Sequence, residues 1–492
     1  MTLRTFRWSA VAAILLIALW SIAFGDAGGA HQVAVGSVHM DPRWIAMFAI
    51  GATFDTAAAD AMLKVVSDDA FFDSVVTHSD VLDIYEQNSN VREGPHGRYV
   101  ELSNMFGYNE AVGARHERGF LPIPGNPTFV NGRVKLKKTL AVAQMTYDVM
   151  KQAMRSKAAF ADWAEAELTK TEKSLRDDLD RQAIGYGSGI LCRVDGSAAA
   201  GPPATIPIDA PYGLVSDTKG WLPGIRRGTS LVFGPNPDGA NLRNNGESCT
   251  VLSVNKAGNA GGGILTVDHI PVGVVDNDYV FKGDDLGSNA PFQGVEVEMI
   301  GIEGQVDNGS ILQTFQNIDR VQYPEWNSQF LDGSLAPYSG LAKDTAFMQL
   351  NDDIVELGGG DGATHALVTR AVFRNIYVQI RGFAGFGALL SPENTRAGVR
   401  GIKIWLGDKQ VEFRACSKLF PGRAFMLDRT QLRRYHLEGY EWDDTTGAIW
   451  RQIAVGQGVK DEFFAYGRTI MELGNQDPQK HGKIAGLSEA QA

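Results

Sequence analysis

The sequence predicts an α+β protein, and three observations lead to that prediction. A long amphipathic helix is expected over residues 158–183, a glycine-punctuated β-excursion precedes it over 97–138, and short strands follow over 222–283. With 492 residues, the chain exceeds the size that one hydrophobic core ordinarily serves. Its 44% hydrophobic and 21% charged residues are typical of a folded protein. We therefore expect two or three domains, or one domain with long excursions.

The helix prediction rests on apolar residues that recur every three or four positions between residues 158 and 183. Glycines at 185, 187 and 189 follow directly and end the pattern. At ~1.5 Å per residue such a helix is nearly 40 Å long, by the usual helix geometry. The apolar stripe consists of Phe160, Ala164, Leu168, Thr171, Leu175 and Leu179.

The excursion at 97–138 combines aromatic and β-branched residues with six interspersed glycines and with prolines at 122, 124 and 127. This pattern predicts two long strands with little hydrophobic core of their own. Loops of this length are uncommon inside compact domains and usually have a function.

The remaining elements are shorter. Strands are expected at Leu231–Phe233, Ser248–Val254, Ile264–Val267 and Tyr279–Phe281, as a small barrel or a pair of hairpins. Further along, we expect a helix near Ala363–Phe373, a hairpin of Ile402–Leu406 with Val411–Ala415 around Gly407-Asp408, and a final strand within Asp461–Leu473.

Charge and motifs exclude several functions. The net charge of −11 argues against a domain that grips DNA or RNA. The sequence contains no HExxH, P-loop lysine, GxSxG or CxxC pattern. Cys192, Cys249 and Cys416 are far apart, which favours buried free thiols over a disulfide framework or a zinc site. No catalytic, cofactor-binding or metal-binding residue is predicted.

The N-terminus carries an uncharged apolar segment, residues 8–25, behind Arg4 and Arg7. By pattern this is a signal peptide or a short membrane anchor, and the alternative is an apolar arm buried in an assembly. No other segment approaches the ~18 uncharged apolar residues that a membrane span needs.

Read in order, six segments carry a family resemblance. They are GRYVELSNMFGYNEAVGARHERGFLPIPG from residue 97, TYDVMKQA from 146, AAFADWAEAELTKTEKSLRDDLDRQAIG from 158 with the GYGSG turn that closes it, IDRVQYPEW at 318–326, PGRAFMLD at 421–428, and VKDEFFAYGRTIMELGNQDPQKHGKI at 459–484. In this order the chain resembles the major capsid proteins of tailed bacteriophages, with the Hong Kong 97-type fold, from about Asp55 to Leu487. The resemblance rests on shared order and spacing, since each segment is weak alone.

The resemblance implies a division of the chain, with 222–283 as a β-rich insertion. The parts are 1–54 (N-terminal extension with the apolar segment), 55–96 (N-terminal arm), 97–138 (extended loop), 139–221 (peripheral domain with the spine helix), 222–283, 284–343 (connection), 344–450 (axial domain) and 451–492 (C-terminal return to the peripheral domain).

The resemblance also implies a structural, non-enzymatic protein without cofactors. It would self-assemble through hexamers and pentamers into an icosahedral shell, built in the host cytoplasm, that encloses double-stranded DNA without sequence-specific binding. Its partners would be its own copies, with separate scaffolding, portal and decoration proteins, and no membrane despite residues 8–25. The implied intersubunit-loop residues are Tyr99, Phe106, Tyr108, Glu117, Arg118, Phe120 and Lys135, and Phe160, Leu168, Leu175 and Leu179 would pack the spine helix.

Two alternatives stay open. One is a secreted or periplasmic β-rich enzyme or adhesin, with residues 1–30 as its signal peptide. The other is an encapsulin-like nanocompartment shell, which would use the same fold to enclose cargo protein. Neighbouring genes would separate a phage from a compartment.

Overall fold

The computed structural model separates the chain into two units, Met1–Gly51 and Ala52–Ala492. All described residues belong to the second unit. They are 81–88, 99–107, 111–114, 116–117, 119–120, 125–126, 128–146, 171, 173–196, 204–214, 224–256, 262–283, 297–339, 344–382, 401–407, 409–443, 451–455 and 458–489. The apolar segment 8–25 and most of the predicted N-terminal arm therefore lie outside them. No helix in this part of the chain is long and apolar enough to cross a membrane.

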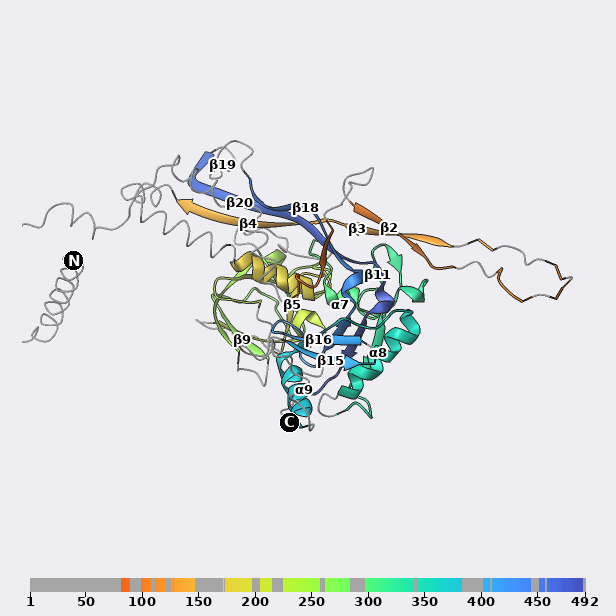
Figure 1. Ribbon diagram of the computed structural model, residues 1–492. Helices are drawn as coiled ribbons and strands as arrows, with labels where there is room; N and C mark the ends of the chain where they lie inside the picture. Colours follow the sequence, from red (N-terminus) through yellow and green to blue (C-terminus); the bar gives the residue numbers. More distant parts are fainter. Residues whose placement is uncertain are drawn as a thin grey trace, which may run out of the picture. The chain divides into compact units, whose positions relative to one another are not determined.

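A five-stranded sheet is organised around one long strand, β20, as Figure 1 shows in blue. The strands are β1 (Glu86–Asn88), β4 (Lys137–Thr146), β18 (Leu432–Trp442), β19 (Arg451–Val455) and β20 (Gly458–Asn475). β20 pairs antiparallel with β4, β18 and β19, and β1 adds in parallel to β18. The strand expected within Asp461–Leu473 is confirmed.

Six short strands close into a barrel. They are β5 (Ile190–Val194), β6 (Ala204–Asp209), β7 (Ser230–Gly234), β8 (Cys249–Asn255), β9 (Gly263–Val267) and β10 (Tyr279–Lys282), in the order β10-β5-β6-β9-β8-β7. The four strands expected after residue 222 are β7 to β10, and of the two arrangements considered the barrel is correct. β5 and β6 come from before that range. The short helices η1 (Pro211–Gly213) and η2 (Arg243–Gly246) connect the strands.

A second sheet has six strands. Its order is β13 (Gln329–Asp332), β21 (Gly482–Ala485), β17 (Ala424–Leu427), β14 (His365–Thr369), β16 (Lys409–Cys416) and β15 (Gly401–Leu406). Helices α8 (Asp344–Gly358) and α9 (Arg370–Gly382) bury their apolar sides in one cluster with this sheet. The hairpin at residues 402–415 is confirmed as β15–β16, with Gly407 at positive φ.

The helix expected at Ala363–Phe373 is wrong in its first half. Residues His365–Thr369 form β14, which is buried along its whole length between β16 and β17. A short continuous apolar run fits a buried strand as well as a helix, because periodicity does not distinguish the two. The helix α9 begins only at Arg370.

The main core joins the barrel, the five-stranded sheet and the end of the long helix. Residues 173–184 are helical, and Gly185 follows as a bend. Leu175 and Leu179 of this helix are buried together with Ile206 of the barrel and Met471 of β20. The described end of the helix thus agrees with the prediction, whereas Phe160 and Leu168 lie outside the described residues. The three cysteines are buried free thiols, as expected.

Between the barrel and the six-stranded sheet, the chain forms short elements. They are α7 (Ile302–Gln305), β11 (Thr314–Phe315), β12 (Ile318–Asp319) and η4 (Pro324–Trp326), and nearer the C-terminus η5 (Arg429–Gln431) and η6 (Pro478–Lys480). β11 and β12 pair as a small hairpin. This hairpin contacts β3 (Phe129–Lys135), which pairs with β2 (Tyr99–Met105).

Candidate functional site

The β2–β3 ribbon, drawn in orange in Figure 1, is a two-stranded sheet. Its register runs from Tyr99 opposite Lys135 to Met105 opposite Phe129. The predicted two-stranded excursion is therefore confirmed. Gly132 and Val134 are buried on one face, whereas alternate residues on the other face, such as Glu101 and Asn131, are exposed.

The base of the ribbon is fixed by backbone contacts to the small β11–β12 hairpin. The N–H of Arg133 donates to the carbonyl of Gln316 at 2.7 Å. Gln316 and Asn317, at the tip of this hairpin, both have positive φ, as a tight two-residue turn requires. The turn thereby presents a carbonyl to β3, outside its own pairing.

Aromatic side chains pack together at the base of the ribbon. We call Phe106, Phe315, Tyr323 and Trp326 the anchor cluster. The Phe106 ring stacks on Tyr323 with centroids 5.1 Å apart and meets Trp326 edge-on at 5.8 Å. The indole N–H of Trp326 donates to the carbonyl of Phe315 at 3.2 Å. Phe106 is therefore held by residues more than 200 positions later in the same chain.

A buried charge network adjoins the anchor cluster, since the Arg320 guanidinium lies 4.9 Å from the centroid of the Phe315 ring. The network consists of Glu303, Asp307, Arg320, Arg423 and Lys483. The Lys483 Nζ lies 3.1 Å from Asp307 and 3.4 Å from Glu303, and Arg423 also pairs with Glu303. Arg320 donates to the carbonyls of Gln305 and Gly304 at 2.7 and 3.0 Å and lies 3.6 Å from Asp307. The three cations come one each from the segments at 318–326, 421–428 and 459–484 that carried the family resemblance.

Burial changes the protonation equilibria of this network. It lowers the pKa of Lys483 to about 8, and Arg423 adds to this effect while Asp307 opposes it. It also lowers the pKa of Arg320 to about 10. Burial alone would raise the pKa of Asp307, but Lys483 and the N–H groups of Ile311 and Leu312 hold it below its ordinary value. A buried network of this kind is costly to break, because removing one partner leaves another charge uncompensated.

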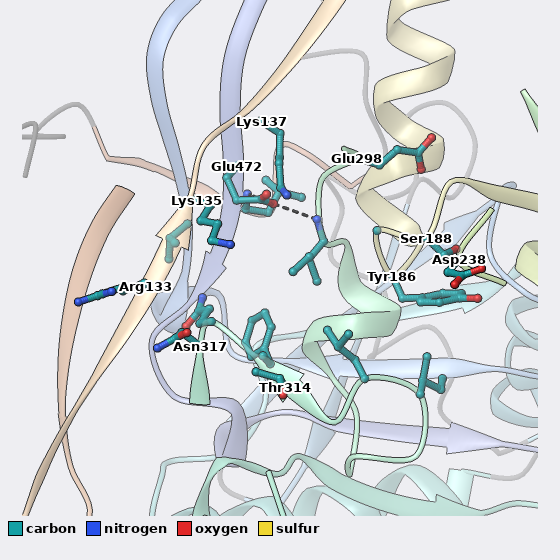
Figure 2. Close-up of a pocket in the computed structure, with 18 of the residues that line it drawn as sticks. Arg133, Lys135, Lys137, Tyr186, Ser188, Asp238, Glu298, Thr314, Asn317 and Glu472 are labelled. Carbon is teal, nitrogen blue, oxygen red and sulfur yellow. Dashed lines mark hydrogen bonds between the residues drawn. The ribbon is translucent and has the colours of Figure 1, made fainter. Parts of the chain in front are cut away.

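A pocket of about 460 Å³ opens beside the base of the ribbon. Figure 2 shows Lys135 and Lys137 on its ribbon side, next to Glu472 of β20. The carboxyl of Glu472 accepts hydrogen bonds from the N–H groups of Ile300 at 2.9 Å and Leu473 at 3.0 Å. Burial raises the pKa of Glu472 to about 8, so this group is mostly protonated at neutral pH.

The pocket is lined by several hydrogen-bonding groups. Glu298, at its far side, is neutralised by a bidentate pairing with the buried Arg181. No histidine or cysteine is found among its described lining residues, which include Gln316, whose amide has no hydrogen-bond partner. Nor does any group of three metal-ligating side chains occur in the described part of the chain.

The implied intersubunit-loop residues separate into a base and a tip. At the base, Phe106 is in the anchor cluster, Lys135 lines the pocket, and Tyr99 lies beneath the Arg133 guanidinium, 5.0 Å from the ring centroid. At the tip, Glu117 is exposed and Phe120 is 95% exposed. Tyr108 and Arg118 lie outside the described residues.

Sequence reasoning missed the residues that hold the ribbon. Arg320, Tyr323 and Trp326 lie within the segment 318–326, but nothing in their spacing indicated that Tyr323 and Trp326 contact Phe106. Asp307 and Glu472 were missed because each also has a partner more than 150 residues away in sequence, Lys483 for Asp307 and Ile300 for Glu472.

Comparisons with known proteins give matches at the level of structure. No family model matches the sequence, and no curated protein matches it. Similar solved structures include the capsid asymmetric unit of cyanophage A-1(L), at 8% identity and a TM-score of 0.41, covering 84% of this chain and 92% of the other. The procapsid of satellite phage P4 with its size-determination protein has 8% identity and a TM-score of 0.34, covering 86% and 100%.

The capsid of Myoviridae phage XM1 is a third similar structure, at 8% identity and a TM-score of 0.36, covering 82% of this chain and 90% of the other. These similar structures are phage capsid structures, and the chain shares with them a strand-rich α+β composition. At such identities and TM-scores below 0.5, a proposal of function has to depend on the chain's own residues.

Proposed function

We propose that this chain is the major capsid protein of a tailed bacteriophage with the Hong Kong 97-type arrangement of domains. Copies self-assemble through hexamers and pentamers into an icosahedral shell that encloses double-stranded DNA. The observation that carries the proposal is the β2–β3 ribbon. Its base is fixed by the anchor cluster, whereas Phe129 and Phe120 farther along are exposed.

An open ribbon of this kind needs a partner. An isolated two-stranded hairpin is marginally stable in water, and this one pairs with no other strand in the described residues. Phe129 at its end is 59% exposed, and Phe120 beyond it is almost fully exposed. Large exposed apolar side chains on an extended arm indicate a contact surface. A neighbouring copy supplies such a surface, since repeated contacts around a ring close on themselves.

The parts of the chain take their roles from this assignment. Residues 97–138 reach across the neighbour, with Tyr99, Phe106 and Lys135 at the base and Tyr108, Glu117, Arg118 and Phe120 toward the tip. The helix that carries Phe160, Leu168, Leu175 and Leu179 is the spine of the peripheral domain. Helices α8 and α9 and strands β14 to β17 belong to the axial domain at 344–450, and β13 and β21 extend its sheet from outside that range. The insertion at 222–283 supplies β7 to β10 of the barrel, which β5 and β6 from the preceding part complete.

The proposed protein is structural and has no catalytic role. Its acidic balance suits a wall that surrounds DNA without gripping it, because strong cationic contacts would hinder packaging and release. Separate scaffolding, portal and decoration proteins complete the proposed particle, which assembles in the host cytoplasm.

The test shortens the ribbon at a point that the backbone allows. Gly107 and Thr128 exchange two N–H···O=C bonds, of 3.4 and 3.3 Å, so an Asn-Gly turn can join them in place of residues 108–127. We expect the full chain to form hollow icosahedral particles in negative-stain electron microscopy. The shortened chain should fold, with an unchanged melting temperature, and form none. Normal particles from the shortened chain would contradict the proposal.

A further inference from the structure

The two helices that cover the six-stranded sheet carry opposite charges. α8 contains Asp344, Asp352, Asp353 and Glu356 and no basic residue. α9 contains Arg370, Arg374 and Arg381 and no acidic residue. Acidic and basic side chains are therefore segregated between these two helices.

Each helix exposes its charges in a stripe together with apolar side chains. The α8 face, defined by Met348, Asp352, Val355 and Glu356, lies on the side of the helix opposite its buried residues. The α9 face is defined by Arg370, Arg374 and Val378, spaced four residues apart. The apolar members are 40–47% exposed. Among the described residues, none of these charges has an opposite partner within ion-pair distance.

Helix stability does not explain these positions. Acidic residues are favourable near a helix N-terminus and basic residues near a C-terminus, because of the helix dipole. Glu356 instead lies in the last turn of α8, and Arg370 is the first residue of α9. Both placements are unfavourable for the isolated helices, so the helix dipole does not account for them.

The two faces belong to helices with different packing partners. α8 packs over β13, β21 and β17 and also reaches β15, where the Asn351 amide donates to the carbonyl of Leu406 at 3.3 Å, whereas α9 packs over β14 and β16. Each edge strand also exposes an aromatic side chain, Phe330 on β13 and Trp405 on β15. The domain therefore has an acidic side and a basic side, each with apolar surface.

We propose that these sides meet head to tail in the capsomer, with the α8 face of one copy on the α9 face of the next. This inference rests on the proposed capsid function and specifies its ring contact. Two complementary patches on different parts of one subunit make a heterologous contact, which closes into rings when the rotation allows. Opposite charges set the register, and like-charge pairing of α8 with α8, or α9 with α9, is repelled.

The test uses two variants, Asp352→Lys/Glu356→Lys and Arg370→Glu/Arg374→Glu. The first has two basic faces and the second two acidic faces. We expect each alone to lose capsomers by about tenfold or more, since like charges then face each other. An equal mixture should form rings again by alternating the two chains. Alternation fits a six-membered ring but not a five-membered one, so the mixture should give hexamers without closed shells.

The matched controls separate surface charge from the specific contact. Arg227→Glu/Lys256→Glu makes the same change of net charge as Arg370→Glu/Arg374→Glu, but at exposed positions of the barrel region, and should assemble like the wild type. A chain with all four helix changes should regain both hexamers and pentamers. Melting temperatures should stay within a few degrees in every variant, because all the changed side chains are exposed.

The outcomes distinguish the two proposals. Wild-type chain that forms no rings or shells contradicts the capsid function itself. Normal assembly by either two-residue variant, or a mixture that stops at dimers, leaves the capsid function standing and overturns the head-to-tail contact.

Discussion

β3 and β4 are two halves of one extended segment, separated only by Leu136, and they have opposite environments. β4 pairs with β20 along its whole length, and Ala143 in it is 2% exposed. β3 pairs only with β2, and Phe129 at its start is largely exposed. Both halves are extended strands. β20 pairs with every residue of β4, whereas on β3 the chain buries Gly132 and Val134 but leaves Phe129 exposed. In the proposed capsid, a neighbouring copy covers that exposed end.

The largest expected effect comes from placing a charge on each half. Ala143→Asp puts an unpaired carboxylate in the main core and should cost about 5 kcal/mol or more of unfolding free energy. The matched change Asn131→Asp, at an exposed position of β3, should stay within about 0.5 kcal/mol. Urea unfolding followed by circular dichroism measures both. Equal losses in the two variants would remove the contrast between the halves.

The next effect is a difference in unfolding free energy between changes at the base of the ribbon and changes at its tip. Trp326→Ala empties the centre of the anchor cluster and should cost about 3–5 kcal/mol, as for other buried aromatic residues. Phe120→Ala should leave the free energy of unfolding unchanged within about 0.5 kcal/mol, because that ring has no contact to lose in the subunit. Particle yield should fall in the Phe120 variant. A destabilised Phe120 variant would mean that the tip folds back on its own subunit.

A smaller effect is the pH dependence that Glu472 contributes. Its pKa rises from 4.5 in the unfolded chain to about 8 in the folded protein. The folded state therefore holds a proton that the unfolded state loses, and this contribution to stability is full below 4.5 and lost as the pH rises through 8. Glu472→Gln should flatten the fall in unfolding free energy between pH 5.5 and 8.5.

The smallest effect concerns the turn that receives β3. Asn317 has φ +65°, which glycine adopts without steric cost, so Asn317→Gly should raise stability by up to about 0.5 kcal/mol. Asn317→Ala should instead lower it by about 1 kcal/mol. Differential scanning calorimetry resolves the two signs. A loss in the glycine variant would show that the Asn317 side chain itself supports the turn.

The sequence was sufficient for elements whose signals are local. Periodicity located the end of the long helix, the hairpin β15–β16 and four barrel strands, and glycine-rich alternation located the ribbon. It failed at His365–Thr369, where a buried strand and a helix share the same apolar run.

The contacts of the anchor cluster and of the buried charge network could not be predicted, for a different reason. Whether Phe106 meets Tyr323, or Lys483 meets Asp307, depends on how distant segments fold together, and no property of a single segment encodes that. The same holds for the two charged helix faces. Their composition is visible in the sequence, but their exposure is known only once the buried sides of α8 and α9 are known.

The pairing of β4 with β20 has a consequence for synthesis. β4 emerges from the ribosome more than 300 residues before its partner strand, and Lys483, the last cation of the buried network, comes later still. A nascent chain therefore carries the ribbon long before it can fix the base. In the proposed assembly, where copies engage through this ribbon, the order of translation would therefore delay association until each chain is complete.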